Sequence, residues 1–320
     1  MIPAKRYIFH LAASTPLLLP EYKGSTLRGG FGHAFKKVVC TFRGKPCDNC
    51  LLKHRCAYSY IFETPPPENS AKMVKYLRAP HPYIIEPPLE KRETYSAGET
   101  LKFGLVLIGR AMEYLPYFVY AFEELGMMGI GKRKGEFRLD RVCCGDDVVY
   151  EGATKVLNSL SCRDAEGTEN NIEEGQRQIV LNFLTPTRLV LNEKLMAAPD
   201  FQTIFRTLLR RLSMLSYFHC GKELDLDYKG LIELAGSVVT TERNIHWWDW
   251  ERYSSRQDER MKLGGFVGEM AFTGDLGKFI PFLRAGEMVH VGKGTGFGLG
   301  LYVMEENGCN QLATSLSSSG

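Results

Sequence analysis

The 320-residue sequence has no apolar run of the roughly 18 residues that a membrane-spanning helix needs. The apolar tract Leu17–Leu19 is too short for a secretion signal, and no small-residue cleavage site follows it. A strong excess of basic charge is also missing, since 40 Lys and Arg face 37 Asp and Glu for a net charge of +3. A nucleic-acid ligand must therefore be argued from local charge. We expect a cytoplasmic protein with no membrane partner.

A disulfide framework is excluded by the cysteine count, which is nine and therefore odd, in a chain too long to need such stabilisation. Four cysteines are close in sequence, at Cys40, Cys47, Cys50 and Cys56. Four thiols in a reducing compartment are typical of a structural tetrahedral Zn²⁺ site, which has no open position for catalysis. Reduced thiols without a metal and an iron–sulfur cluster are the alternatives.

Two stretches of the chain share one pattern. In Tyr7–Leu19 and in Ile179–Leu191, an apolar strand runs into Thr-Pro and a further apolar triplet. A Gly-Lys loop follows each stretch at a similar separation, at Gly131–Gly135 and Gly292–Gly296. This repeated order predicts a tandem duplication. We expect one domain over residues 1–150, with a cysteine-rich insertion at 40–56, and a second over residues 177–306. An acidic linker at 164–174 and a disordered tail at 307–320 complete the chain.

The secondary structure is predicted to be mixed. Glu99–Ile108 has the alternation of a strand, and Tyr114–Leu125 has the apolar spacing of a helix that ends at Gly126. The clearest helix is Asp200–Cys220, with one apolar face. Strands and helices in this order predict an α+β fold with two tandem ferredoxin-like domains.

Glycine occupies every second position from Gly292 to Gly300. Alternating glycines let another backbone approach closely, and their N–H groups can face an anion such as a phosphate. The segment is no Walker loop, because glycine follows Lys293, and no Rossmann loop, because the strand-like Leu301–Met304 follows it. A plain bend is the alternative, although five glycines exceed what a bend requires.

The most basic part of the chain surrounds a predicted helix that starts near Gly30. From Lys23 to Arg55 there are eight Lys and Arg and one acid, Asp48, which is the footprint expected of a nucleic-acid ligand. Because His33, Lys36 and Lys37 are spaced i, i+3 and i+4, they share the face opposite the apolar residues. Histidine is suited to proton transfer and lysine to a phosphate, so these three are catalytic candidates.

The segment His290–Tyr302 resembles the glycine-rich loop of the RAMP superfamily, and more narrowly that of CRISPR-associated endoribonucleases that cut precursor CRISPR RNA. Shorter stretches agree in order along the chain, at Gly24–His33, Leu107–Arg110, Gly126–Gly135, Arg252–Gln257 and Leu263–Phe266. The resemblance implies attack of an RNA 2′-hydroxyl on the adjacent phosphate within a repeat. The products are a 5′-hydroxyl and a 2′,3′-cyclic phosphate, and no catalytic cofactor is implied.

The resemblance also implies roles for single residues. A histidine on or near the first helix recurs as a catalytic residue in this family, and His33 is the matching position, with Lys36, Lys37 and Tyr22 in support. CRISPR repeat RNA is the expected partner of a monomer or homodimer, together with other CRISPR effector subunits. A RAMP subunit that binds guide RNA without cutting it is the alternative. The RNA contacts are expected at Arg28, Lys132, Arg133, Lys134, Arg252, Arg256, Gly292, Lys293, Gly294 and Gly296, whereas the three tryptophans near Arg252 are assigned to the core.

Overall fold

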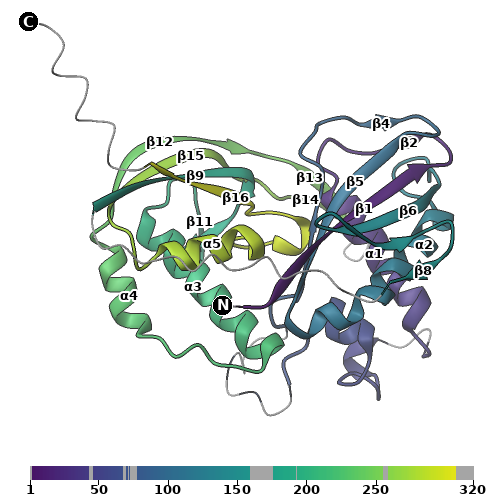
Figure 1. Ribbon diagram of the computed structural model, residues 1–320, viewed down its shortest axis with the longest axis horizontal. Coiled ribbons are helices and arrows are strands. Elements are labelled where there is room, and N and C mark those ends of the chain that lie inside the picture. The colour runs from purple at the N-terminus through teal and green to yellow at the C-terminus, as the bar shows by residue number, and fades with distance from the viewer. Residues whose placement is uncertain are drawn as a thin grey trace, which may run out of the picture. The chain divides into compact units, whose positions relative to one another are not determined.

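A computed structural model describes residues 2–42, 46–67, 70, 72, 78–158, 176–191, 193–254 and 259–307 of the protein (Figure 1). The expected acidic linker and all but residue 307 of the expected tail lie outside these residues. The chain forms two compact units. Unit 1 comprises Met1–Glu166, Ser213–Leu224 and Gly296–Gly298, and unit 2 comprises Gly167–Leu212, Asp225–Thr295 and Leu299–Gly320. No helix within the described ranges has both the length and the apolar character needed to cross a bilayer.

Unit 1 is built on an antiparallel sheet with the strand order β3-β5-β1-β6-β7-β8. Helix α1 (Gly24–Val39) follows β1, and helix α2 (Leu115–Met128) joins β5 to β6. The strands are β1 (Ala4–Ala13), β3 (Tyr83–Glu86), β5 (Thr100–Ile108), β6 (Phe137–Cys144), β7 (Asp147–Glu151) and β8 (Val156–Leu157), and a separate pair joins β2 (Leu17–Leu18) to β4 (Thr94–Tyr95). Short helical turns lie at η1 (Cys47–Asn49), η2 (Ser59–Glu63) and η3 (Gly109–Tyr114).

The core of unit 1 forms where the apolar side of its sheet meets α1 and α2. Alternate residues of β1 are buried, among them Phe9, whose ring lies 5.1 Å from Phe103 and 5.2 Å from Phe122, centroid to centroid. Phe31 of α1 stacks on Phe118 of α2 at 4.6 Å. Aromatic pairs of this geometry add about 0.5–1.5 kcal/mol each to the area they bury. These contacts fix the two helices against the sheet.

The other side of this sheet carries a row of basic groups. The strand register places His10 of β1 opposite Lys102 of β5 and Arg141 of β6. Burial lowers the pKa of His10 below its usual value, Arg141 and Lys102 lower it further, and Asp140 opposes them. His10 is 8% exposed, so its proton uptake is coupled to folding.

This coupling predicts a loss of stability in acid. The unfolded chain binds a proton at His10 more readily than the folded chain, so the free energy of unfolding falls as the pH drops through the ordinary histidine pKa of about 6.5. We expect the melting temperature to fall less between about pH 8 and pH 5.5 in His10→Gln than in the wild type. Equal pH dependence in the two proteins would contradict this assignment.

Unit 2 is built on a four-stranded antiparallel sheet in the order β12-β15-β9-β16. Helices α3 (Phe201–Cys220) and α5 (Ile280–Val289) cover one face of this sheet, as Figure 1 shows. Its strands are β9 (Gln176–Thr187), β12 (Val239–Trp248), β15 (Gly265–Asp275) and β16 (Tyr302–Asn307). The remaining elements are β10 (Leu189–Leu191), β11 (Lys194–Met196), α4 (Tyr228–Ala235), β13 (Glu251–Ser254), β14 (Glu259–Lys262) and η4 (Thr295–Phe297). The predicted apolar face of α3 is confirmed, because Phe201, Ile204, Phe205, Leu208, Leu209 and Leu212 are all buried.

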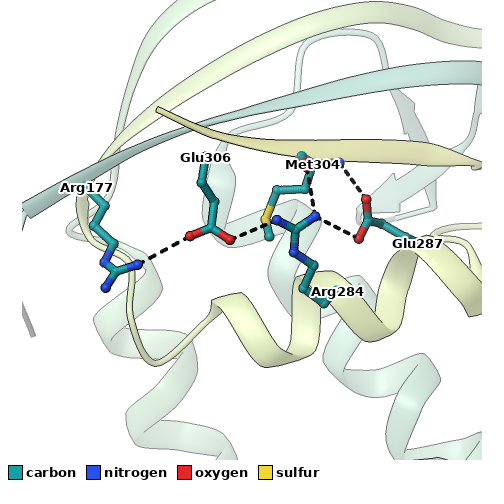
Figure 2. Close-up of polar contacts among 5 residues, drawn as sticks. All are labelled: Arg177, Arg284, Glu287, Met304 and Glu306. Atoms are coloured by element: carbon teal, nitrogen blue, oxygen red, sulfur yellow. Dashed lines mark hydrogen bonds and ion pairs between the residues drawn. The ribbon is translucent and has the colours of Figure 1, made fainter. Parts of the chain in front are cut away.

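An ion-pair network holds the edge strand β16 to α5 and β9 (Figure 2). Arg284 of α5 donates to the carbonyl of Met304 at 2.9 Å and to Glu306 Oε1 at 2.9 Å. The second oxygen of Glu306 accepts from Arg177 at 3.3 Å, and Glu287 accepts from the Met304 amide at 2.8 Å. The network satisfies both the backbone and the charges of these segments, so it fixes the strand that follows the glycine-rich loop.

Both units have the ferredoxin-like strand order, with the first strand central between the third and fourth and the second at the edge. The predicted fold class is therefore confirmed. The two Gly-Lys loops take corresponding places, between α2 and β6 in unit 1 and between α5 and β16 in unit 2. The predicted end of α2 is wrong. The helix continues through Gly126, which packs against the Phe137 carbonyl, and ends at Met128 before Gly129 with a φ of 73°.

Candidate functional site

Helix α1 carries the predicted site, and its glycines allow it to pack closely. A Cβ atom at Gly32 would lie 2.2 Å from the Phe62 ring, and one at Gly30 would lie 2.9 Å from Leu125. Glycine weakens a helix by about 0.5–1 kcal/mol relative to alanine, but here it lets two large apolar side chains reach the helix backbone. Phe31, Ala34 and Phe35 complete the buried side. This packing turns the opposite side of α1 to solvent.

His33 and Lys37 are exposed on this side of α1, and Lys36 beside them is half-buried. Lys37 forms an ion pair with Glu124 of α2. The Lys36 ammonium lies 5.7 Å from the centroid of the Tyr58 ring, a cation–π contact. The described residues give His33 no hydrogen bond or ion pair of its own. The site therefore presents an open imidazole flanked by two amines whose positions are fixed by other side chains.

Tyr22 lies immediately before α1 and is buried. Its hydroxyl donates a hydrogen bond of 2.8 Å to the carbonyl oxygen of Phe297, which belongs to the same unit. Burial raises the pKa of Tyr22 well above its usual value, so the phenol keeps its proton. This placement suits a residue that positions the loop around Phe297, and it is less suited to the predicted direct role in catalysis.

Arg28 of α1 lies against two aromatic rings. Its guanidinium carbon lies 4.0 Å from the centroid of Phe62 and 4.9 Å from that of Phe297. Its Nε atom is buried without a hydrogen-bond partner among the described residues. The contacts with two rings of its own unit leave less of the guanidinium available for the predicted RNA contact.

The glycine-rich loop uses its glycines for close backbone approach, as expected from the alternation. Gly292, Gly294, Gly298 and Gly300 have φ values of 91°, 80°, 83° and 75°. A Cβ atom at Gly292 would lie 2.5 Å from the Arg188 carbonyl oxygen. The amides of Lys293 and Gly300 donate to Arg188 and Pro186 at 2.9 and 3.2 Å. These two amides are therefore engaged within the protein, whereas the side chain of Lys293 is exposed.

The remaining predicted RNA contacts divide into two groups. Lys132, Arg133 and Lys134 are exposed in the loop before β6, where the Lys132 amide donates to the Leu18 carbonyl at 3.1 Å. Arg256 lies outside the described residues, and for Arg252 only the backbone, in β13, is described. Of the nearby tryptophans, Trp250 is buried as expected, but Trp247 is 39% exposed. The expectation that all three are core residues is therefore wrong for Trp247.

The predicted zinc site is not assembled. Cys40, Cys47, Cys50 and Cys56 are free and half-buried, and no group of three or more His, Cys, Asp or Glu side chains in the described ranges is placed to hold a metal ion. The physical reason is packing, because Cys47 and Cys56 lie against the apolar core of unit 1. Burial raises the pKa of the Cys47 thiol. Elsewhere Cys144 is in a disulfide bond, against the expectation of fully reduced cysteines.

Two contacts of the site were not found from the sequence, and one of them removes Lys23 from the expected basic footprint. Lys23 is fully buried, and its ammonium donates to the carbonyls of Glu90 at 2.9 Å and Glu21 at 3.2 Å, which holds the start of α1. Glu124 fixes Lys37 from α2. The sequence contains no signal for the second contact, because 87 positions separate the partners. The burial of a lysine that lies just before the first turn of a helix cannot be predicted from sequence either.

Two families match the sequence. Residues 2–161 match the family AF_1859_N, an N-terminal domain, and residues 181–302 match the CRISPR-associated endoribonuclease Cas6 family. An uncharacterized protein of Archaeoglobus fulgidus is 26% identical over 172 residues, which cover 52% of this chain and 56% of that protein. The chain thus spans little more than half the length of this relative.

Solved structures share the fold over almost the whole chain. Cas6 of Thermus thermophilus aligns with a TM-score of 0.54 and 16% identity, over 95% of this chain and 99% of that one. A Cas6 product complex aligns with a TM-score of 0.55 and 18% identity, over 94% and 99% of the two chains. A partial Cas6-RT-Cas1–Cas2 complex aligns at 0.56 and 12%, over 96% of this chain and 46% of that one.

The two ferredoxin-like units lie in tandem along the chain, and each has a glycine loop between a helix and the fourth strand of its ferredoxin-like sheet. The chain belongs to the AF_1859_N family, and residues 181–302 are similar to the CRISPR-associated endoribonuclease Cas6 family.

Proposed function

We propose that this protein cleaves precursor CRISPR RNA within its repeats, without a catalytic metal, and that His33 transfers a proton in the reaction. The exposed imidazole of His33, one helical turn before Lys36 and Lys37 on α1, is the observation that supports this proposal most strongly. The proposed substrate is the repeat RNA, and the proposed protein partners are other CRISPR subunits. The likeness to a Cas6-RT-Cas1–Cas2 complex supports the proposed protein partners, and it does so through the fold alone.

In the proposed reaction, the 2′-oxygen of one nucleotide attacks the phosphorus of the adjacent phosphate. The bond from phosphorus to the 5′-oxygen breaks, which leaves a 2′,3′-cyclic phosphate and a 5′-hydroxyl. One proton leaves the 2′-hydroxyl and one is added to the 5′-oxygen, and His33 carries out one of these transfers. The ammonium groups of Lys36 and Lys37 lie beside the phosphate and stabilise the negative charge that develops on its oxygens.

The proposal is tested by incubating the purified protein with repeat RNA in excess EDTA. We expect one cut per repeat, a cyclic phosphate on the upstream product, and no cleavage of RNA that carries a single 2′-deoxynucleotide at the cut site. Cleavage that requires an added divalent ion would contradict metal independence. Tight binding without any cleavage would support a RAMP subunit that only holds RNA.

A variant of Tyr22 tests whether this residue positions the loop around Phe297 or takes part in proton transfer. Tyr22→Phe removes the hydrogen bond to Phe297, which contributes about 0.5–1.5 kcal/mol, and keeps the buried ring. We expect the single-turnover rate to fall by less than roughly tenfold, with an unchanged pH profile, because the loop loses only one constraint. A fall of about 100-fold or more, together with a changed pH profile, would assign Tyr22 a direct part in proton transfer.

A further inference from the structure

Tyrosine rings form a continuous column in unit 1, from η2 to the outer side of α2. The ring centroids of Tyr60 and Tyr114 are 5.3 Å apart, and those of Tyr114 and Tyr117 are 5.7 Å apart. Exposure increases along the column. Tyr60 and Tyr114 are half-buried, and Tyr117 is 44% exposed. Tyr120 follows Tyr117 by one turn of α2 and is 53% exposed, but it makes no ring contact with the column among the described residues. The outer end of the column is therefore open to solvent.

The inner end of the column is fixed by polar contacts. His219 Nε2 donates to the Pro80 carbonyl at 2.8 Å, so its Nδ1 atom accepts from the Tyr60 hydroxyl at 3.3 Å. The guanidinium of Arg110 lies over the Tyr60 ring, 4.4 Å from its centroid. Burial raises the pKa of Tyr60 to about 12, so the phenol remains a donor at neutral pH. A ring column anchored in this way loses little conformational freedom when a ligand stacks on its open end.

The open end lies beside the face of α1 that carries His33. Tyr117 meets the ring of Phe35 edge to face at 6.4 Å, which ties it to the second half of α1. Tyr120 precedes Glu124 by one turn on α2, and Glu124 pairs with Lys37, one turn after His33 on α1. The exposed tyrosines and the exposed imidazole thus border one surface within unit 1.

The charge around these rings suits the phosphates of a nucleic acid better than an apolar partner. The Arg110 guanidinium lies over the Tyr60 ring and the Lys36 ammonium over the Tyr58 ring. Lys37 and Glu124 neutralise one another, and Glu123 accepts from the Tyr150 hydroxyl. Glu113 is exposed. Unstacked RNA bases are recognised on aromatic rings next to such cations, and one stacked base contributes about 1–3 kcal/mol to binding.

We propose that Tyr117 and Tyr120 form a stacking platform for an unpaired base of the RNA, next to the phosphate that lies at His33. The proposal rests on the proposed function in one respect, namely that the ligand is RNA. The platform holds a neighbouring nucleotide and so sets which phosphate faces the imidazole. Both tyrosines are positioning residues, since neither touches the reacting atoms.

The test compares Tyr117→Leu/Tyr120→Leu with the matched control Tyr117→Phe/Tyr120→Phe, which keeps both rings. Repeat RNA that carries 2-aminopurine at successive unpaired positions next to the cut site reports stacking through quenching of its fluorescence. We expect the leucine variant to bind with a Kd raised roughly 5- to 150-fold, the equivalent of one stacked base, and to lose the quenching. The phenylalanine variant is expected to keep both. The melting temperatures of both variants show whether they are folded.

The outcomes separate this proposal from the nuclease activity. A leucine variant that is folded and keeps the wild-type Kd and quenching would overturn the platform, whatever its cleavage rate. Wild-type protein that quenches the probe and binds the RNA but does not cut it would support the platform and contradict the proposed reaction. A wild-type protein that does not bind the repeat RNA would overturn both.

Discussion

His33→Ala is expected to lower the single-turnover rate of RNA cleavage by about 100- to 10,000-fold, the range for loss of a group that transfers a proton in the transition state. The Kd for the repeat RNA should change little, because the amines of Lys36 and Lys37, which we propose to lie beside the phosphate, remain. The measurement is cleavage of end-labelled repeat RNA at saturating protein, with the Kd determined separately. His33 is exposed and makes no contact that the fold requires, so the variant should fold normally.

A second histidine provides the matched control for this variant. His246 is also exposed, but it lies on β12 in unit 2. His246→Ala should therefore cleave at the wild-type rate. Because the position of His33 is open, added imidazole should restore part of the activity of His33→Ala. Cleavage by His33→Ala at the wild-type rate would remove this residue from the mechanism and leave the family membership intact.

Gly300→Ala is expected to have the largest effect on stability. Gly300 has a φ of 75°, and a Cβ atom there would lie 1.8 Å from the carbonyl oxygen of Val291. The backbone must move to accommodate it, which disrupts the hydrogen bonds from Val291 N to Gly300 O and from Gly300 N to Pro186 O. We expect the free energy of unfolding to fall by about 2–4 kcal/mol and the melting temperature by roughly 5–15 °C.

Gly29→Ala is the control for this effect, because glycine is again replaced by alanine. Gly29 lies inside α1, and a Cβ atom there would meet nothing within 4 Å. Alanine should stabilise the helix by about 0.5–1 kcal/mol, because it restricts the unfolded chain more than glycine does. Calorimetric melting of both variants checks the pair. If Gly29→Ala lost as much stability as Gly300→Ala, the loss would come from replacing any glycine by alanine and not from the close contacts at Gly300.

The fold was largely accessible from the sequence because its signals are local. The apolar periodicity of Phe201–Cys220 predicted α3, and the repeated Thr-Pro and Gly-Lys segments predicted two similar units. The ending of α2 could not be predicted in this way. Glycine is common at the end of a helix, so Gly126 was expected to end α2. In the structure the Phe137 carbonyl approaches so closely that a glycine is required at this position inside the helix. At this position the packing contact between α2 and Phe137 outweighs the tendency of glycine to end a helix.

The candidate site could be predicted from the sequence only in part. The spacing of His33, Lys36 and Lys37 follows from the helical period, so the sequence alone determined that they share one side of α1. The zinc expectation finds no support among the described residues, where no group of three or more His, Cys, Asp or Glu side chains is placed to hold a metal ion, and cysteine spacing does not reveal such a placement. Tyr22 and Arg28 look alike in sequence as polar candidates, yet one is buried against Phe297 and the other lies against two rings.

The sequence by itself determined the class of fold, the tandem organisation and the presence of a helix at His33, although this helix begins at Gly24 and not near Gly30 as predicted. These features follow from local periodicity and from motifs that recur in the same order along the chain. Only the tertiary structure decided which polar groups are open to a ligand and which are engaged. Glu124 neutralises Lys37 from 87 positions away, and the rings of Phe62 and Phe297 contact Arg28 from opposite ends of the chain. The physical reason is that exposure and electrostatics depend on neighbours in space, which a spacing along the chain does not specify.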